Sequence, residues 1–155
     1  TKFQMAGGLS IKNLHDLIEA AARSHPSVKS FGSGERHLIS PGGGTESVNV
    51  WLEQPFFRTL QIPERGSPTR TYRVQFMVLD IPMEDRSDEL DIISRSDLIA
   101  DWIIIKLNEE TDAWLGQSIS VMSLAAYHGD LWAGVRVELE LTTGMPIDAC
   151  DVRNL

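Results

Sequence analysis

The sequence predicts an α+β domain in which two helices pack on one face of a four- to five-stranded, mainly antiparallel sheet. Two kinds of periodicity lead to this prediction. Apolar residues recur at helical spacing near the start of the chain and again over about 87–110, whereas apolar and polar residues alternate over 69–80 and 131–141. The elements follow in the order αββαββ. Packing both helices on one sheet face is the simplest way to bury these apolar sides.

The size and charge of the chain limit its class. Its 155 residues suit one domain, which we expect over 10–143, with a flexible N-terminal arm at 1–9 and an extended C-terminal arm at 144–155. The formal charge is −8, so its surface repels phosphate and tight nucleic-acid binding is not expected. An acidic wall past which DNA slides is compatible with this charge. No apolar run approaches the ~18 residues of a membrane span, so no membrane partner is expected.

The first helix is predicted over Ile11–Ser24. Ser10 is a typical N-cap residue, whose hydroxyl accepts from an early backbone N–H. Leu14 and Ile18 share one helix face, with further apolar residues beside them. Pro26 ends the helix, because the residue before a proline is disfavoured in the α region.

The next stretch, 27–45, is rich in glycine and is predicted to be loop, with a possible short strand at 37–39. A strand is predicted over about 48–53, where apolar and polar residues alternate as far as Pro55. The β-prone segment 56–62 is expected to continue this strand beyond a bulge.

The clearest strand of the first half is Thr69–Asp80. Tyr72, Val74, Phe76 and Val78 should face the core, and the residues between them should form a wet face. The preceding loop contains two prolines and a glycine. The strands on either side of it are therefore predicted to form an antiparallel hairpin with a long, exposed tip.

The second helix is predicted over Ser87–Glu110, with Ser87 as its N-cap. The residues expected to face the sheet are Leu90, Ile93, Ile99, Trp102, Ile103 and Leu107. Ile104 and Ile105 widen the apolar belt until it nearly surrounds the helix, which indicates burial on more than one side. The second side would pack on the first helix or on a neighbouring subunit. Two further strands, 118–127 and 131–141, should form a hairpin around Gly129.

An acidic cluster surrounds the start of the second helix: Glu84, Asp85, Asp88, Glu89 and Asp91. Paired carboxylates can perform acid–base chemistry or hold Mg²⁺. The helix dipole explains them without catalysis, since it favours anions at a helix N-terminus. We therefore interpret the cluster as an acidic face toward a partner or toward passing DNA.

No other constellation predicts catalysis or a cofactor. His15, Asp16 and Glu19 share part of a helix face, but they lack the further ligands of a zinc site and fit a solvated surface better. The glycine loop at 31–34 matches neither phosphate-binding pattern. Cys150 is the only cysteine, and no activating neighbour can be assigned to it. We expect no catalytic residue, no metal and no cofactor.

Several residues at positions predicted to be exposed indicate contact with another subunit or a partner protein. Aromatic residues fall where the pattern predicts a wet surface, and such residues are enriched at interfaces. Folding back onto their own domain is the alternative for each of them. The candidate interface residues are Pro55, Phe56, Phe57, Arg58, Arg65, Trp114, Trp132, Met145 and Ile147.

Over residues 9–145 the chain resembles the tail-terminator and tail-completion proteins of the tailed-bacteriophage neck. The resemblance lies in the opening LHDLIEAAARSHPSVKSFGSGERH, in the Trp-containing strand VNVWLEQP, and in a strand ending in Asp that leads through an acidic stretch to a long helix. The loop PERGSPT and the long C-terminal arm depart from the family pattern. These departures leave open a related adaptor or connector ring.

This resemblance implies an αββαββ subunit of a ring, usually sixfold, that terminates the tail tube and joins it to the head connector while DNA passes through the lumen. It implies a virion protein assembled in the host cytoplasm, without enzymatic activity or cofactor. Its partners would be copies of itself, the tail tube protein and the neck connector proteins. The alternatives are a minor virion binding module without ring symmetry and, less favoured, a small metal-dependent hydrolase.

Overall fold

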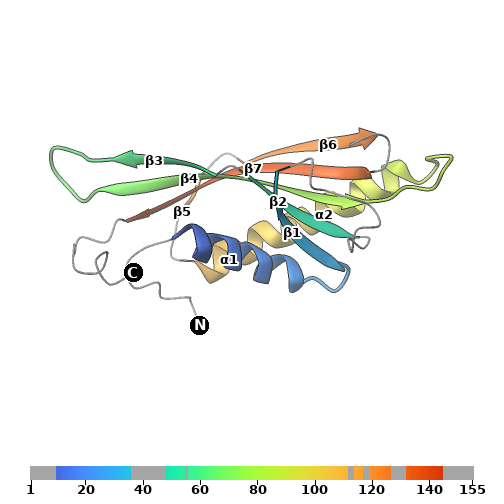
Figure 1. Ribbon diagram of the computed structural model, residues 1–155, viewed down its shortest axis with the longest axis horizontal. Helices are drawn as coiled ribbons and strands as arrows, with labels where there is room; N and C mark the ends of the chain where they lie inside the picture. The colour runs from blue at the N-terminus through green and yellow to red at the C-terminus, as the bar shows by residue number, and fades with distance from the viewer. Residues whose placement is uncertain are drawn as a thin grey trace.

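The computed structural model describes residues 10–35, 48–54, 56–111, 114–116, 119–126 and 132–144. Within these ranges the chain forms two helices and one seven-stranded sheet, an α+β fold (Figure 1). The elements in chain order are α1 (Ile11–Arg23), β1 (Ser30–Gly34), β2 (Asn49–Glu53), β3 (Phe57–Gln61), β4 (Thr69–Asp80), α2 (Glu89–Glu110), β5 (Trp114–Leu115), β6 (Ser120–Ala126) and β7 (Trp132–Gly144).

The sheet is five positions wide, because two of its positions each hold two short strands. The path is β1-β2-β4-β7-β5, with β3 also paired to β4 and β6 also paired to β7. β2 pairs with residues 76–79 of β4, and β3 follows it along the same edge at residues 69–73. The α+β class, the predicted break near Pro55 and the predominantly antiparallel pairing are confirmed. The described sheet has seven strands where four or five were predicted, because short strands were missed and one predicted strand is divided in two.

β1 is a correction to the sequence prediction, which placed a loop there. Residues 30–34 pair in parallel with 49–53. Their sequence, SFGSG, has no clear apolar alternation, so the strand is defined by backbone pairing rather than by side-chain pattern. The two-residue strand β5 was likewise not predicted, and the possible strand at 37–39 lies outside the described residues.

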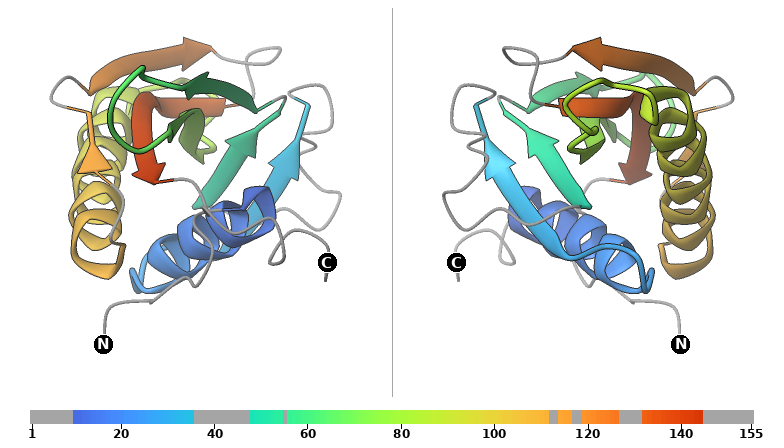
Figure 2. Two further views of the ribbon diagram at one scale, coloured as in Figure 1. Left: turned by 90° about the vertical axis from the view of Figure 1, so that its left-hand side faces the viewer. Right: turned by 90° about the vertical axis from the view of Figure 1, so that its right-hand side faces the viewer.

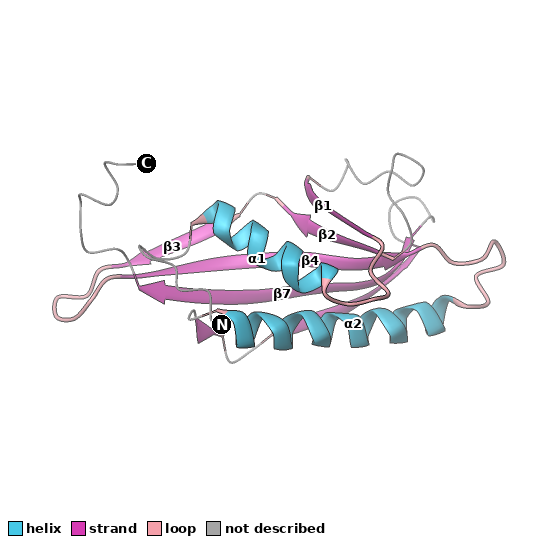
Figure 3. Cartoon of the chain, turned by 90° about the horizontal axis from the view of Figure 1, so that it is seen from below, coloured by secondary structure: helices cyan, strands magenta, loops and turns pink. Residues whose placement is uncertain are grey.

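Both helices cover the same face of the sheet, as predicted (Figures 2 and 3). Ser10 caps α1 by accepting a hydrogen bond from the Asn13 backbone N–H at 3.1 Å. The buried side of α1 and the buried side of α2 pack on alternate residues of β2, β4 and β7. The four β4 residues predicted to face the core, Tyr72, Val74, Phe76 and Val78, are all buried there.

The N-cap of α2 lies one residue later than predicted. Asp88 occupies the N-cap position, and Ser87 instead donates to the Asp85 carboxylate. Leu90 does not face the sheet, because 79% of its surface is exposed. The buried residues of α2 are Ile92, Ser96, Ile99, Ala100, Ile103 and Leu107.

The opposite sheet face is only partly wet. At one end it carries a second buried apolar cluster of Trp51, Met77, Leu79, Leu124 and Trp132. Beyond this cluster polar side chains cross the strands, and Arg136 of β7 donates to Glu53 of β2 at 3.0 and 2.9 Å. Met77, which the alternation of β4 places on the wet face, is therefore buried from the other side of the sheet.

Candidate subunit interface

The hairpin formed by residues 56–73, which we call the arm, projects beyond the helices at one end of the molecule (Figures 1 and 3). All five residues of β3 are exposed. Phe57, Leu60 and Ile62 are 57%, 41% and 73% exposed, which is unusual for large apolar side chains so close together. Among the described strands β3 pairs with β4 alone, so its outer edge can accept another strand or chain.

Four of the predicted interface residues lie in the arm, and three of them are exposed: Phe57, Arg58 and Arg65. Phe56 is different, because it is half-buried against the main core and is thus a packing residue at the base of the arm. Leu60 and Ile62 were not among the predicted residues. Their signal was present in the segment FFRTLQI, whose apolar residues fall on both sides of one strand, so that a single core cannot bury them all.

Trp132 is not an interface residue, contrary to the prediction. It is fully buried in the second cluster, because Met77 and Leu79 of β4 and Trp51 of β2 make that end of the opposite face apolar. Pro55, Met145, Ile147 and the side chain of Trp114 lie outside the described residues.

A second exposed region lies at the other end of the long axis (Figure 1). We call residues 80–101 the acidic end, because they contain eight carboxylates and only two arginines. Both arginines are already paired: Arg86 with Glu89, and Arg95 with Asp80. The acidic end therefore presents an excess of negative charge to solvent.

Part of the predicted acidic cluster shapes the loop before α2. Asp85 accepts from the backbone N–H of Ser87 at 3.1 Å and from its hydroxyl at 2.9 Å. These hydrogen bonds lower the pKa of the Asp85 carboxyl from its usual value of 3.8, and the bond from the Ser87 backbone N–H has the larger effect. Asp88 accepts from the Met83 backbone N–H at 2.9 Å. These carboxylates have local structural roles that the helix dipole alone did not predict.

Other members of the acidic end face solvent. Glu84 and Asp91 are exposed, and neither has an ion-pair partner in the part of the chain that the structure describes. Three large apolar side chains are exposed beside them: Ile81, Met83 and Leu90. The acidic end thus has the mixed apolar and charged character of an interface rim and core.

Part of the apolar surface of α2 that does not face the sheet packs on α1, and the rest is exposed to solvent. Trp102 donates from Nε1 to the Ser24 hydroxyl at 2.9 Å, and its ring meets His25 edge-on at 5.6 Å. Leu98 and Ile105, on either side of Trp102, remain exposed. Trp102 was predicted to face the sheet, but it lies against the end of α1 and is 37% exposed, so that placement is corrected. The expectation that part of the apolar excess packs on the first helix is confirmed.

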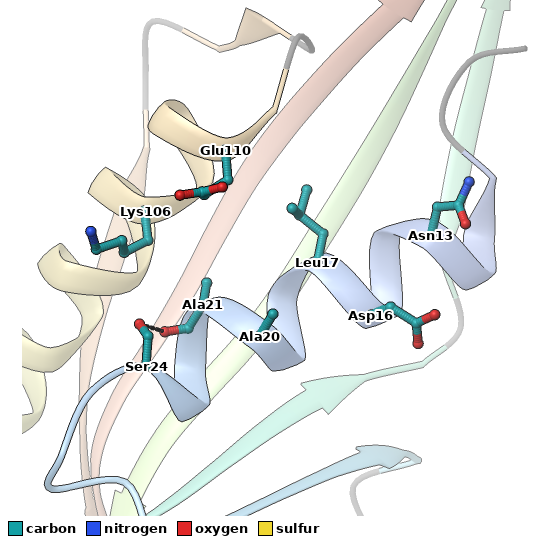
Figure 4. Close-up of a pocket in the computed structure, with 8 residues that line it drawn as sticks. All are labelled: Asn13, Asp16, Leu17, Ala20, Ala21, Ser24, Lys106 and Glu110. Carbon is teal, nitrogen blue, oxygen red and sulfur yellow. Dashed lines mark hydrogen bonds between the residues drawn. The ribbon is translucent and has the colours of Figure 1, made fainter. Parts of the chain in front are cut away.

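A hollow of about 440 Å³ lies between the two helices (Figure 4). Leu17, Ala20 and Ala21 of α1 form its apolar floor, and Lys106 and Glu110 of α2 stand on the opposite side. The side chains of Ala20 and Ala21 are too small to fill the space between the two helices.

His15, Asp16 and Glu19 are the one group of possible metal ligands in the described ranges, with ligand atoms within 4.8 Å of one another. His15 Nδ1 lies 3.2 Å from Asp16 Oδ1, and Glu19 already pairs with Arg23 at 3.0 Å. The sequence favours a solvated helix face here, and the expectation that it holds no metal stays a prediction.

No helix in the described part of the chain has the length and apolar character needed to cross a bilayer. No protein-family model matches the chain, and no curated protein matches it either.

Proposed function

We propose that this protein is the subunit of a structural ring in the neck of a tailed bacteriophage. In this role it terminates the tail tube and joins it to the head connector, and DNA passes through the lumen. The sequence resemblance supports the role, and the α+β fold with two helices on one sheet face agrees with what the resemblance implies.

The exposed arm is the observation that carries this proposal. Phe57, Leu60 and Ile62 expose apolar surface to water along a projecting hairpin, and β3 leaves a strand edge open. Exposed apolar surface costs about 25 cal/mol per Å² relative to burial, so association that covers it is favourable. An exposed edge strand favours the same outcome, because its backbone groups can pair with another chain.

The proposed protein works by contact and uses no metal or cofactor. Its partners are further copies of itself, six in the usual ring of this kind, together with the tail tube protein and the connector above it. Negative charge is appropriate for surfaces near DNA that must move without sticking. The proposed location is the virion neck, after assembly in the host cytoplasm.

Electron microscopy of the purified full-length protein tests the ring. Closed rings of one size are the expected result. Particles with the dimensions of a monomer, both alone and with the tail tube protein, would contradict the proposal.

A binding assay separates the tail-terminator role from the adaptor role. A terminator should bind the purified tail tube, whereas a connector or adaptor ring should bind the head connector and leave the tube unbound. Binding to neither structure would favour the minor virion module.

A further inference from the structure

We propose that the arm of one copy binds the acidic end of the next copy, so that subunits associate head to tail. The inference rests on the proposed ring and names the surfaces that would build it. It follows from the placement, charge and exposure of two regions at opposite ends of the same chain.

The first observation is the separation of charge along the molecule. The arm, residues 56–73, contains four arginines and one glutamate, a net charge of +3, although the whole chain carries −8. The acidic end, residues 80–101, has eight carboxylates and two arginines, a net charge of −6. Figures 1 and 3 place the tip of the arm and the loop before α2 at opposite ends of the long axis.

The second observation is that charged side chains of both regions are available for contact. Arg58 and Arg65 are exposed, and neither forms an ion pair with any described residue. At the other end, Glu84 and Asp91 are exposed in the same way. Complementary potentials of this kind steer association and define which surfaces meet.

The third observation is exposed apolar surface at both ends. Phe57, Leu60 and Ile62 lie on the arm. Ile81, Met83 and Leu90 lie at the acidic end, where Leu90 is 79% exposed. Each end therefore combines apolar side chains with charge, and the charges have opposite sign. The arm of one copy can therefore cover the acidic end of its neighbour, with apolar side chains meeting apolar side chains and arginines meeting carboxylates.

Because the two surfaces differ, the contact is heterologous. Repetition of a heterologous contact produces a closed ring when the rotation closes, and an open filament when it does not. A self-complementary pair of arms would instead stop at a dimer, and two basic arms would repel each other. Charge therefore favours the head-to-tail arrangement over an arm-to-arm dimer.

Charge reversal tests the contact in the full-length protein. We expect R58E/R65E to weaken self-association at least tenfold in sedimentation velocity at low ionic strength, and E84R/D91R to do the same. When the two variants are mixed, association should return only between a copy of R58E/R65E and a copy of E84R/D91R, because at these four positions each variant alone carries charges of one sign. The quadruple variant, with both surfaces reversed, should assemble again as the wild type does. Circular dichroism checks that each variant is folded.

The matched control is K12E/K29E, which changes the charge by the same amount on the α1 side of the molecule. It should assemble normally.

Wild-type assembly should weaken with added salt, since the screening length falls from about 10 Å at 0.1 M to about 3 Å at 1 M.

Each other outcome has a distinct meaning. Rings that persist in both charge-reversed variants would overturn the head-to-tail contact and leave the ring standing. Salt-sensitive filaments that obey the charge reversals would keep the contact and overturn the ring. A wild-type monomer at low salt and high concentration, both alone and with the tail tube protein, would overturn both. Arginine-dependent binding of the arm to duplex DNA, without self-association, would assign the arm to nucleic acid instead.

Discussion

Among single residues, Phe57 should separate folding from assembly most cleanly. Its side chain is 57% exposed on a projecting hairpin, so Phe57→Asp should leave the fold intact and abolish assembly. Thermal unfolding and size-exclusion chromatography measure the two effects. The matched control is Phe76→Ala in the fully buried part of β4, which should lower the free energy of unfolding by about 3–5 kcal/mol. Loss of folding in Phe57→Asp would show that Phe57 belongs to the core.

Asp85 provides a test of the loop that precedes α2. Two hydrogen bonds from Ser87 lower its pKa in the folded protein. Removing the hydroxyl in Ser87→Ala should raise the pKa of Asp85 part of the way back, because the backbone N–H still donates. Carboxyl-carbon NMR titration measures the change. Since the folded pKa is lowered, the associated stability is present above the unfolded pKa and is lost as pH falls through the folded pKa. An unchanged pKa in the variant would contradict the hydroxyl contact.

Local rules predicted individual residues well where the neighbours in sequence decide the outcome. Ser10 caps α1 as expected, because the cap depends on only the next few residues. Trp132 and Leu90 were assigned incorrectly, because their burial depends on strands and loops distant in the sequence. For Trp132 the alternation was right, and the error was to assume that the second sheet face is wet throughout.

Among the elements, the sheet is tied together by a charge pair that joins β2 to β7. Glu53 is 4% exposed and accepts from Arg136 at 3.0 Å. Arg136→Ala should lower the free energy of unfolding by about 3–5 kcal/mol, because a buried carboxylate loses its guanidinium partner. Urea denaturation measures this. The double variant E53M/R136M should recover most of the loss. A small effect from Arg136→Ala would show that water replaces the guanidinium.

The pairing of β4 with β7 depends on a glycine. A Cβ on Gly134 would lie 1.8 Å from the carbonyl oxygen of Val78, which is backbone and cannot move alone. Gly134→Ala should therefore cost roughly 4 kcal/mol or prevent folding. Gly144→Ala, at the open end of the same strand, has no atom within 4 Å and should change stability by less than about 0.5 kcal/mol. Equal stabilities of the two variants in urea would contradict this pairing geometry.

Periodicity predicted the long elements accurately and missed the short ones. The limits of β4 were predicted at Thr69 and Asp80, because its alternation is regular over its whole length. β1 was missed since its glycines carry no side-chain pattern. Gly32 lies so close to the Trp51 ring that a Cβ would approach it to 2.5 Å, and this fit is visible only once the strands are paired.

For the whole molecule, the sequence predicted the fold class and the exposed hairpin, but it could not predict that positive and negative charge lie at opposite ends. The basic arm and the acidic end are adjacent in sequence, and a formal charge of −8 hides the difference between them. The tip of the arm and the loop before α2 lie far apart because the 12 residues of β4 extend between them, about 40 Å at roughly 3.3 Å per residue. Three of the nine predicted interface residues are exposed on the arm. The exposed Leu60 and Ile62 beside them were not predicted and are seen only in the structure.

Native mass spectrometry of the full-length protein at low ionic strength tests the central claim most directly. We predict one closed oligomer, six times the mass of the chain, that dissociates into folded monomers as salt is added. A monomer under all of these conditions, alone and with the tail tube protein, or a ladder of oligomers without a closed size, would contradict the ring.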